Sequence, residues 1–150
     1  MKNHKEFQFG WLVIIIIIFM EIFFTYLYIN KIGDRPLTTN VFIIVSGMNA
    51  VILLLFYGMV VTVNHEKVKI SFGIGVISKT IKMTSIKSIE VVKNPLYYGW
   101  GIRLIPHGWL YNMSGSHGIE VTFIGKNRVI RIGSKDSANL KNEIMKRLKN

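Results

Sequence analysis

A single carboxyl group inside a long apolar run is the residue of this sequence whose chemistry most needs an explanation. Glu21 lies past the middle of run 9–29, where every other side chain is uncharged. A lone carboxylate in such surroundings is costly, and it is usually kept because it carries protons or ions or holds a polar partner. The second apolar run, 41–63, supplies Ser46 and Asn49 as partners. The pattern therefore predicts an intramembrane polar contact between these three side chains.

The spacing of these residues predicts the depth at which each of them lies. If the loop between the runs folds symmetrically, so that Asn30 and Asn40 share a depth, Glu21 is level with Asn49 and Ser46 is one helical turn away. Our interpretation is a protonated Glu21 that hydrogen-bonds to Asn49 and holds two helices together, because neither run contains a second acid or a base. A proton or ion relay and a contact with another protein's span are the alternatives.

Basic residues in the second half of the chain form the other candidate site. Lys69, Lys79 and Lys82 flank a Gly-Ile-Gly turn at 73–75, and Arg103 lies among glycines and aromatic residues. Basic side chains close to an anionic membrane surface gain about 1 kcal/mol each. We therefore predict that these residues contact anionic lipid, and that Arg103 makes the most directed contact.

Composition and spacing argue against most catalytic and metal chemistry. The chain has no cysteine, so disulfides, thiolate metal sites and a cysteine nucleophile are excluded. Segment 73–80 resembles a phosphate-binding loop, but the residues after it continue a strand instead of opening a helix. We expect no enzyme, cofactor or metal site, because no paired acids or catalytic triad stand out. Four histidines share no ligand spacing: His4, His65, His107 and His117.

Two long apolar runs predict the architecture of the first part of the chain. Runs 9–29 and 41–63 contain 21 and 23 residues. As helices they would measure about 31 and 34 Å, enough to cross a hydrocarbon layer of roughly 30 Å. A chain of 150 residues cannot bury both runs in its own core. Residues 1–63 are therefore predicted to form a transmembrane hairpin, followed by a soluble domain at 64–150.

The distribution of positive charge predicts the orientation of this hairpin. Lys2, Lys5 and four lysines between residues 64 and 83 flank one side, whereas Lys31 and Arg35 lie in the connecting loop. The side with more positive charge stays in the cytoplasm. Both termini are therefore predicted to be cytoplasmic, and the expected location is the cell membrane, crossed twice.

After residue 63 the pattern changes from continuous apolarity to alternation. Leu140, Ile144 and Leu148 recur at helical spacing behind a capping Ser134, so the end of the chain is predicted to be a helix. We predict about seven antiparallel strands before it, because no helix-length segment separates them. The clearest strands have apolar residues at every second position, in segments 68–72, 76–83, 86–93, 119–124 and 129–132.

A block of aromatic and glycine residues relates this domain to a known family. The block consists of Tyr97-Tyr-Gly-Trp-Gly-Ile-Arg103, Gly108-Trp-Leu-Tyr-Asn112 and Ser114-Gly115, and a strand, a turn and a helix follow it. It resembles the bacterial pleckstrin-homology-like domain of small membrane-anchored proteins, over roughly residues 64–148. The resemblance implies a strongly bent, seven-stranded antiparallel barrel with a C-terminal helix, often following one or two membrane spans.

The charge of the chain indicates the class of partner. Nineteen Lys and Arg against eight Asp and Glu give a net charge of +11. Fifteen basic and five acidic residues after residue 63 account for +10 of it. A basic domain tethered beside an anionic leaflet favours the membrane surface over nucleic acid. We expect a non-enzymatic binding or scaffold protein that engages anionic lipid or another membrane protein, self-association included. The alternative is a small subunit of a transport, export or stress-response complex, with partner contacts through the spans.

Overall fold

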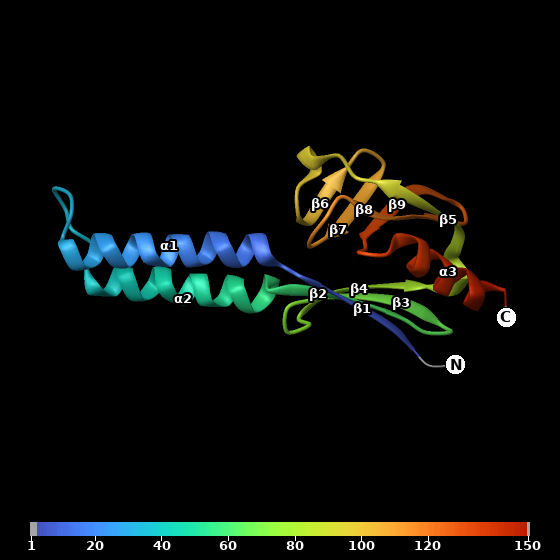
Figure 1. Ribbon diagram of the computed structural model, residues 1–150, viewed down its shortest axis with the longest axis horizontal. Coiled ribbons are helices and arrows are strands. Elements are labelled where there is room, and N and C mark those ends of the chain that lie inside the picture. Colours follow the sequence, from blue (N-terminus) through green and yellow to red (C-terminus); the bar gives the residue numbers. More distant parts are fainter. Residues whose placement is uncertain (1–2, 150) are drawn as a thin grey trace.

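The computed structural model describes residues 3–149 and shows two long helices projecting from one end of a β domain (Figure 1). Helices α1 (Trp11–Asn30) and α2 (Thr39–Phe56) are antiparallel neighbours, and both are long and apolar enough to cross a membrane. In these helices only Ile17 and Asn49 are buried. Their apolar surface therefore faces outward, as a lipid environment requires.

Side chains of both helices hold the end of the hairpin that lies away from the β domain. Tyr28 stacks on Phe42 with ring centroids 4.5 Å apart, and its hydroxyl lies 3.1 Å from Thr39 Oγ1. Thr38 caps α2, because its side chain accepts a hydrogen bond from the amide of Val41. These contacts fix how the two helices are joined.

The second helix is shorter than the sequence indicates. The sequence predicts one span over 41–63, but α2 ends at Phe56 and Gly58–Val63 form strand β2. The run stays apolar because Met59 and Val61 are completely buried in the β domain. Apolarity by itself does not separate a buried strand from the end of a membrane span.

Sheet one contains four antiparallel strands in the order β1-β2-β3-β4. Strand β1 (His4–Phe9) lies before α1 and pairs with β2, so that Phe9 is opposite Gly58. Strands β3 (Lys67–Phe72) and β4 (Ile77–Lys82) complete the sheet. Strand β1 was not expected, because its short alternation leads directly into an apolar run. The hairpin is thus inserted between two paired strands.

Sheet two contains five strands in the order β5-β8-β9-β7-β6. Strands β7 and β9 are parallel, unlike the antiparallel arrangement predicted from the sequence, and the other neighbours are antiparallel. The β8–β9 hairpin brings its second strand beside β7, and that strand runs in the same direction as β7. The bounds are β5 (Ile86–Lys93), β6 (Gly101–Ile105), β7 (Gly108–Asn112), β8 (His117–Phe123) and β9 (Lys126–Gly133).

Both sheets and helix α3 (Ser137–Leu148) enclose one hydrophobic core. Among the residues described, no strand pair joins the two sheets, so they form an open sandwich and not a closed barrel. Asp136 caps α3 by accepting from the amide of Asn139, a role that the sequence assigned to Ser134. Short 3-10 turns precede β5 and β6, at Met83–Ser85 and Leu96–Tyr98. Completely buried core residues include Met59, Val61, Val63, Val68, Ile70, Leu110, Ile119, Val121, Ile132, Leu140 and Ile144.

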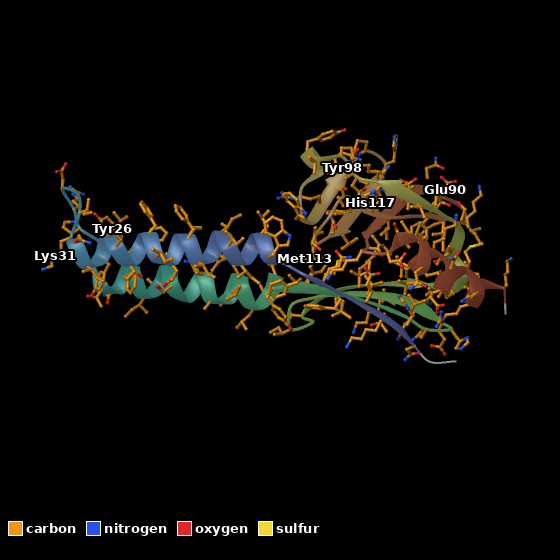
Figure 2. All side chains as sticks on the ribbon, in the orientation of Figure 1. Tyr26, Lys31, Glu90, Tyr98, Met113 and His117 are labelled. Atoms are coloured by element: carbon orange, nitrogen blue, oxygen red, sulfur yellow. The ribbon has the colours of Figure 1, made fainter. Side chains whose placement is uncertain are left out.

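Strand β1 connects the two sheets through its side chains. Gln8 is completely buried. It donates from Nε2 to the carbonyl oxygen of Gly133 at 2.5 Å and accepts from the amides of Met113 and Ser114 at 3.4 and 3.3 Å. Glu6 accepts two hydrogen bonds from the loop before α3, at 2.7 and 2.6 Å. Strand β1 thus holds both sheets at the base of the hairpin, where Figure 2 shows Met113.

The hairpin enters the β domain without a flexible linker. The amide of Gly10 donates to the carbonyl of Tyr57 at 2.8 Å, so the β1–β2 pairing leads directly into the helices. The amide of Ile74, in the β3–β4 turn, donates to the Leu54 carbonyl at 3.1 Å and so satisfies the end of α2. Gly73 permits this approach, because a Cβ there would lie 2.1 Å from the Leu54 oxygen.

Candidate anion-binding groove and intramembrane cluster

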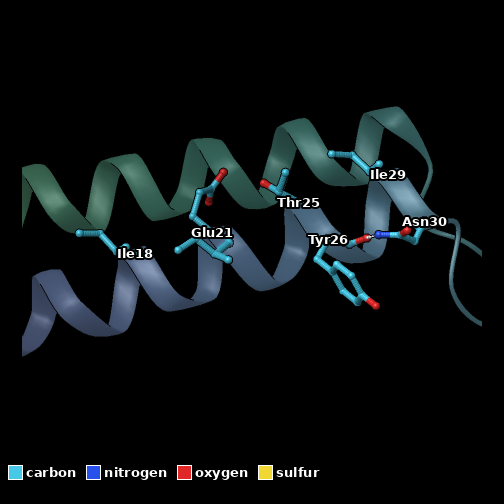
Figure 3. A pocket seen from close by; sticks show the side chains of 7 residues that line it. Ile18, Glu21, Thr25, Tyr26, Ile29 and Asn30 are labelled. Atoms are coloured by element: carbon cyan, nitrogen blue, oxygen red, sulfur yellow. Dashed lines mark hydrogen bonds between the residues drawn. The ribbon is translucent and has the colours of Figure 1, made fainter.

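Glu21, Ser46 and Asn49 lie together between the two helices of the hairpin. Ser46 Oγ donates to Glu21 Oε1 at 2.5 Å, and Asn49 Nδ2 donates to Oε2 at 2.8 Å. Figure 3 shows the Glu21 carboxylate directed at α2, whereas Tyr26 points away from it. The structure thus brings together the three residues that the sequence predicted to lie near one depth.

The chemistry of this cluster is that of a contact between helices. Donors of α2 reach both oxygens of Glu21. No other acidic, basic or histidine side chain lies within 11–30 or 39–56. A proton relay needs a further group that accepts the proton, so the arrangement favours a structural contact. An open depression of about 470 Å³ beside Glu21 is lined mainly by apolar side chains of α1 (Figure 3).

Basic residues of β4 and β9 converge on a groove of about 440 Å³ between the two sheets. One wall is β4, with Lys79 and Lys82, and the other contains Lys126 and Arg128 from the start of β9. Trp109 of β7 also lines the groove and is 41% exposed. All four cations are exposed, and none of the lining residues is acidic. The groove therefore favours an anionic ligand.

The groove exists because sheet two extends past the edge of sheet one. Lys79 pairs with the buried Ile70 of β3, which puts Lys79 on the core-facing side of β4, yet it is exposed. Trp109 pairs with the buried Ile130 of β9, which puts it on the core-facing side of sheet two. Paired residues point to the same face of a sheet. These side chains therefore face inward at a location that the opposite sheet leaves uncovered.

Among the groove residues that were not predicted as site residues are the two cations Lys126 and Arg128 and the exposed Trp109. The alternation of β9 contained a signal for the two cations. Residues 126, 128 and 130 are two positions apart, so both cations point to the same side of the strand as the buried Ile130. They thus occupy positions where an apolar residue would be expected on a fully covered strand. Trp109 is half exposed because β4 does not reach over it.

Lys69 and Arg103 lie outside the groove. Lys69 stands between two completely buried residues of β3 and is exposed, so it points to the outer face of sheet one. Arg103 is on β6, where its Nε donates to the Trp100 carbonyl at 3.1 Å. Leu104, the next residue, pairs with Trp109, so Arg103 points to the opposite face of sheet two. The predicted lipid-binding residues therefore do not form one site; only Lys79 and Lys82 lie together.

The groove lies on the part of the β domain that is farther from the hairpin. The β3–β4 turn contacts the end of α2, and β4 then runs away from the helices (Figure 1). At about 3.3 Å per residue, Lys82 lies roughly 17 Å farther along this strand than Ile77. A ligand can therefore enter the groove without contacting the bilayer that would hold the hairpin.

Comparisons of the chain with protein-family models, with curated proteins and with solved structures found no match. Within residues 3–149, no group of three or more His, Asp or Glu side chains is arranged to hold a metal ion. The basic groove and the polar cluster between the two apolar helices are thus the features on which a function can be based.

Proposed function

We propose that this chain is a membrane-anchored, non-enzymatic binding module that holds an anion-binding groove on the cytoplasmic side of the cell membrane. The observation that carries the proposal is the convergence of Lys79, Lys126 and Arg128 on one groove, with Lys82 at its edge and no acidic side chain in its lining. Like charges held close together repel one another, so an entering anion gains from all of them. The hairpin supplies the anchor, and its two helices are apolar enough for that role.

The position of the groove favours a ligand presented from the cytoplasm over the headgroups of the same bilayer. Lys82 lies at the end of β4 that is far from the hairpin, beside Ser85 and Lys126. An acidic part of another protein, including a membrane protein, can reach this end. Headgroups of the surrounding bilayer would lie at the opposite end of β4. The binding experiment therefore compares an acidic peptide with a lipid surface.

The relation to the bacterial pleckstrin-homology-like domains is part of this proposal. Its support is a four-stranded first sheet, a second sheet and a C-terminal helix, carried on two apolar helices. The parallel pair β7–β9 and the lack of hydrogen-bonded strands between the sheets, among the residues described, differ from the expected antiparallel barrel. The basic groove is present whether or not this relation holds.

A subunit role with partner contacts through the spans is the alternative function. Glu21, Ser46 and Asn49 bond to one another within the chain, which favours the anchor role over a contact with another span. A photo-cross-linker at position 49 separates the two roles. We expect adducts within the chain, whereas adducts with another protein's span would support the subunit role.

Cysteine labelling tests the orientation, because the chain contains no cysteine of its own. We would compare Asp34→Cys, in the loop between the helices, with Lys149→Cys after α3. In intact cells a membrane-impermeant maleimide should label only the first variant. Labelling of the second variant from outside would contradict a cytoplasmic groove.

Charge reversal tests the groove in the full chain, held in nanodiscs of neutral phosphatidylcholine. The probe is a fluorescent polyglutamate peptide, and the readout is its anisotropy at low salt. Lys126→Glu with Arg128→Glu should weaken binding on the order of tenfold, since exposed charge pairs contribute up to about 1 kcal/mol each. Lys5→Glu with Lys135→Glu, exposed residues outside the groove, is the control of equal net charge. Equal weakening by both double variants, or tighter binding to anionic vesicles than to the peptide, would refute the proposal.

A further inference from the structure

Strand β4 is a free edge of sheet one. It pairs with β3 on one side only, and the groove follows its other side. Every second residue of such a strand directs its backbone N–H and C=O outward, where they can pair with another chain. Among residues 3–149, no turn, loop or cap backbone hydrogen bond reaches residues 77–81. The groove therefore has one wall of hydrogen-bonding backbone groups.

The opposite wall is made of side chains and not of a second edge. Strands β9 and β7 have neighbours on both sides, so their backbone groups are used within sheet two. They offer the groove the half-exposed ring of Trp109 and the cations Lys126 and Arg128. Strand β8, which also has neighbours on both sides, adds the partly exposed ring of Phe123. A strand about 4.8 Å from β4 would enter this space. Backbone pairing on one side and side-chain contacts on the other are the two components of strand addition.

We propose that the groove binds an extended acidic segment of a partner protein, which adds to sheet one as a strand beside β4. Acidic side chains at every second position of this strand face the groove, where they contact Lys79, Lys126 and Arg128 and cover Trp109. This inference rests on the proposed function and names the ligand of the same groove. Strand β4 has 6 residues, and a segment of about six residues, roughly 20 Å long, would pair with all of it.

The charge on this edge selects among the strands that could occupy it. Lysines on an edge strand normally protect it from pairing with other strands. A second copy of the chain would bring Lys79 and Lys82 opposite like charges, which destabilises the pairing. The 8 acidic residues of the chain are scattered and form no acidic segment of their own. Nucleic acid would supply phosphates but no row of N–H and C=O groups. An acidic segment of another protein satisfies both the charge and the edge.

Backbone methylation of the probe tests strand addition directly. The probe is a fluorescent peptide of alternating Glu and Val, bound to the full chain in phosphatidylcholine nanodiscs. Two versions carry N-methyl groups on either every Glu or every Val, so that charge and composition are equal. In a paired strand, only the backbone amides of one residue type, either Glu or Val, face β4. We therefore expect one version to bind on the order of tenfold or more weakly, and the other within about twofold of the parent.

Hydrogen exchange and one further pair of variants locate the peptide. The amides of residues 77–82 should exchange more slowly when the parent peptide is bound. Lys79→Glu should weaken binding, whereas Lys5→Glu on β1, the other edge of sheet one, should leave it unchanged.

Each outcome of these experiments decides a specific point. Equal affinity of the two methylated versions would overturn strand addition while leaving an anion-binding groove intact. Binding of an oligonucleotide or of anionic vesicles, but not of the peptide, would overturn the acidic segment as ligand. If no anionic probe binds at all, the proposed function fails as well. Loss of binding in Lys5→Glu would locate the peptide on β1, the other edge of sheet one, and would overturn the inference.

Discussion

Gln8 donates a hydrogen bond from Nε2 to the carbonyl oxygen of Gly133 at 2.5 Å, although the two residues are 125 positions apart in the chain. Gln8 precedes the first apolar helix, and Gly133 ends the last strand. The bond shows that the chain on both sides of the hairpin builds the same β domain. The helices are thus an insertion between β1 and β2, and the β domain is not complete without the strand that precedes them.

Loss of the Gln8 side chain should destabilise the β domain. In Gln8→Ala, the carbonyl of Gly133 and the amides of Met113 and Ser114 lose a buried partner. We expect a loss of about 2–4 kcal/mol in the free energy of unfolding, because each unsatisfied buried group costs about 1–3 kcal/mol. Chemical denaturation of the full chain in detergent measures it. Lys5→Ala, exposed on the same strand, is the control and should change stability by less than about 0.5 kcal/mol; a similar effect of both variants would contradict this role of Gln8.

Removal of the hairpin should leave a folded, soluble β domain. Phe9 and Gly58 are opposite one another in the β1–β2 pairing, so an Asn-Gly turn can replace residues 10–57 and connect the strands as a β-hairpin. The shortened chain should unfold cooperatively in circular dichroism. Fragment 64–150 lacks two of the four strands of sheet one and should not. Cooperative unfolding of that fragment with equal stability would show that β1 and β2 are dispensable.

Two glycines of one turn should respond differently to alanine. Gly73 has φ +49°, and a Cβ there would lie 2.1 Å from the Leu54 oxygen, whereas Gly75 has φ +90° and nothing within 4 Å of its added Cβ. Gly75→Ala should cost about 1–2 kcal/mol from left-handed strain. Gly73→Ala should cost more, because it also breaks the hydrogen bond between Ile74 and Leu54. Thermal unfolding of both variants in detergent tests the order, and equal costs would contradict it.

The polar contact in the hairpin should show a measurable coupling energy. A double-mutant cycle of Glu21→Ala and Asn49→Ala isolates the hydrogen bond of 2.8 Å between the side chains. We expect about 0.6 kcal/mol, and no more than about 1.7 kcal/mol, as for other hydrogen bonds between membrane helices. Unfolding in bicelles supplies the free energies. The cycle of Ile22→Ala with Asn49→Ala is the control, since Ile22 is 65% exposed. An equally large coupling energy in the control would show that the coupling does not come from the hydrogen bond between Glu21 and Asn49.

Acid should destabilise helix α3. A hydrogen bond from Arg147, supported by one from Lys146, lowers the pKa of the Glu143 carboxyl below its ordinary value. Because the folded pKa is the lower one, the stabilisation is present above the unfolded pKa of about 4.3. It is lost as the pH falls through the folded pKa. The melting temperatures of the wild type and Glu143→Gln should therefore differ at neutral pH and converge in acid. A constant difference would contradict an ionised Glu143.

The polar contact between the two apolar helices could be predicted from the sequence better than the basic groove. Glu21 and Asn49 meet because the rise per residue of two antiparallel helices brings them to one depth, and this depends only on the loop between them. Lys79 and Lys126 meet across two sheets. Their meeting depends on which strand forms the edge of each sheet, and no local pattern contains that information. The sequence therefore indicated Lys79 and Lys82 of the groove, and it could not separate them from Arg103, which lies on another face.

The sequence by itself determined two apolar helices, a β domain with alternating strands and a C-terminal helix. These features follow from local periodicity, which a chain carries along its whole length. Only the tertiary structure decided that residues 4–9 and 58–63 pair in one sheet, that β7 and β9 are parallel, and that the sandwich stays open along β4. The physical reason is that strand pairing joins distant segments, and that an apolar residue satisfies a protein core as well as it satisfies lipid.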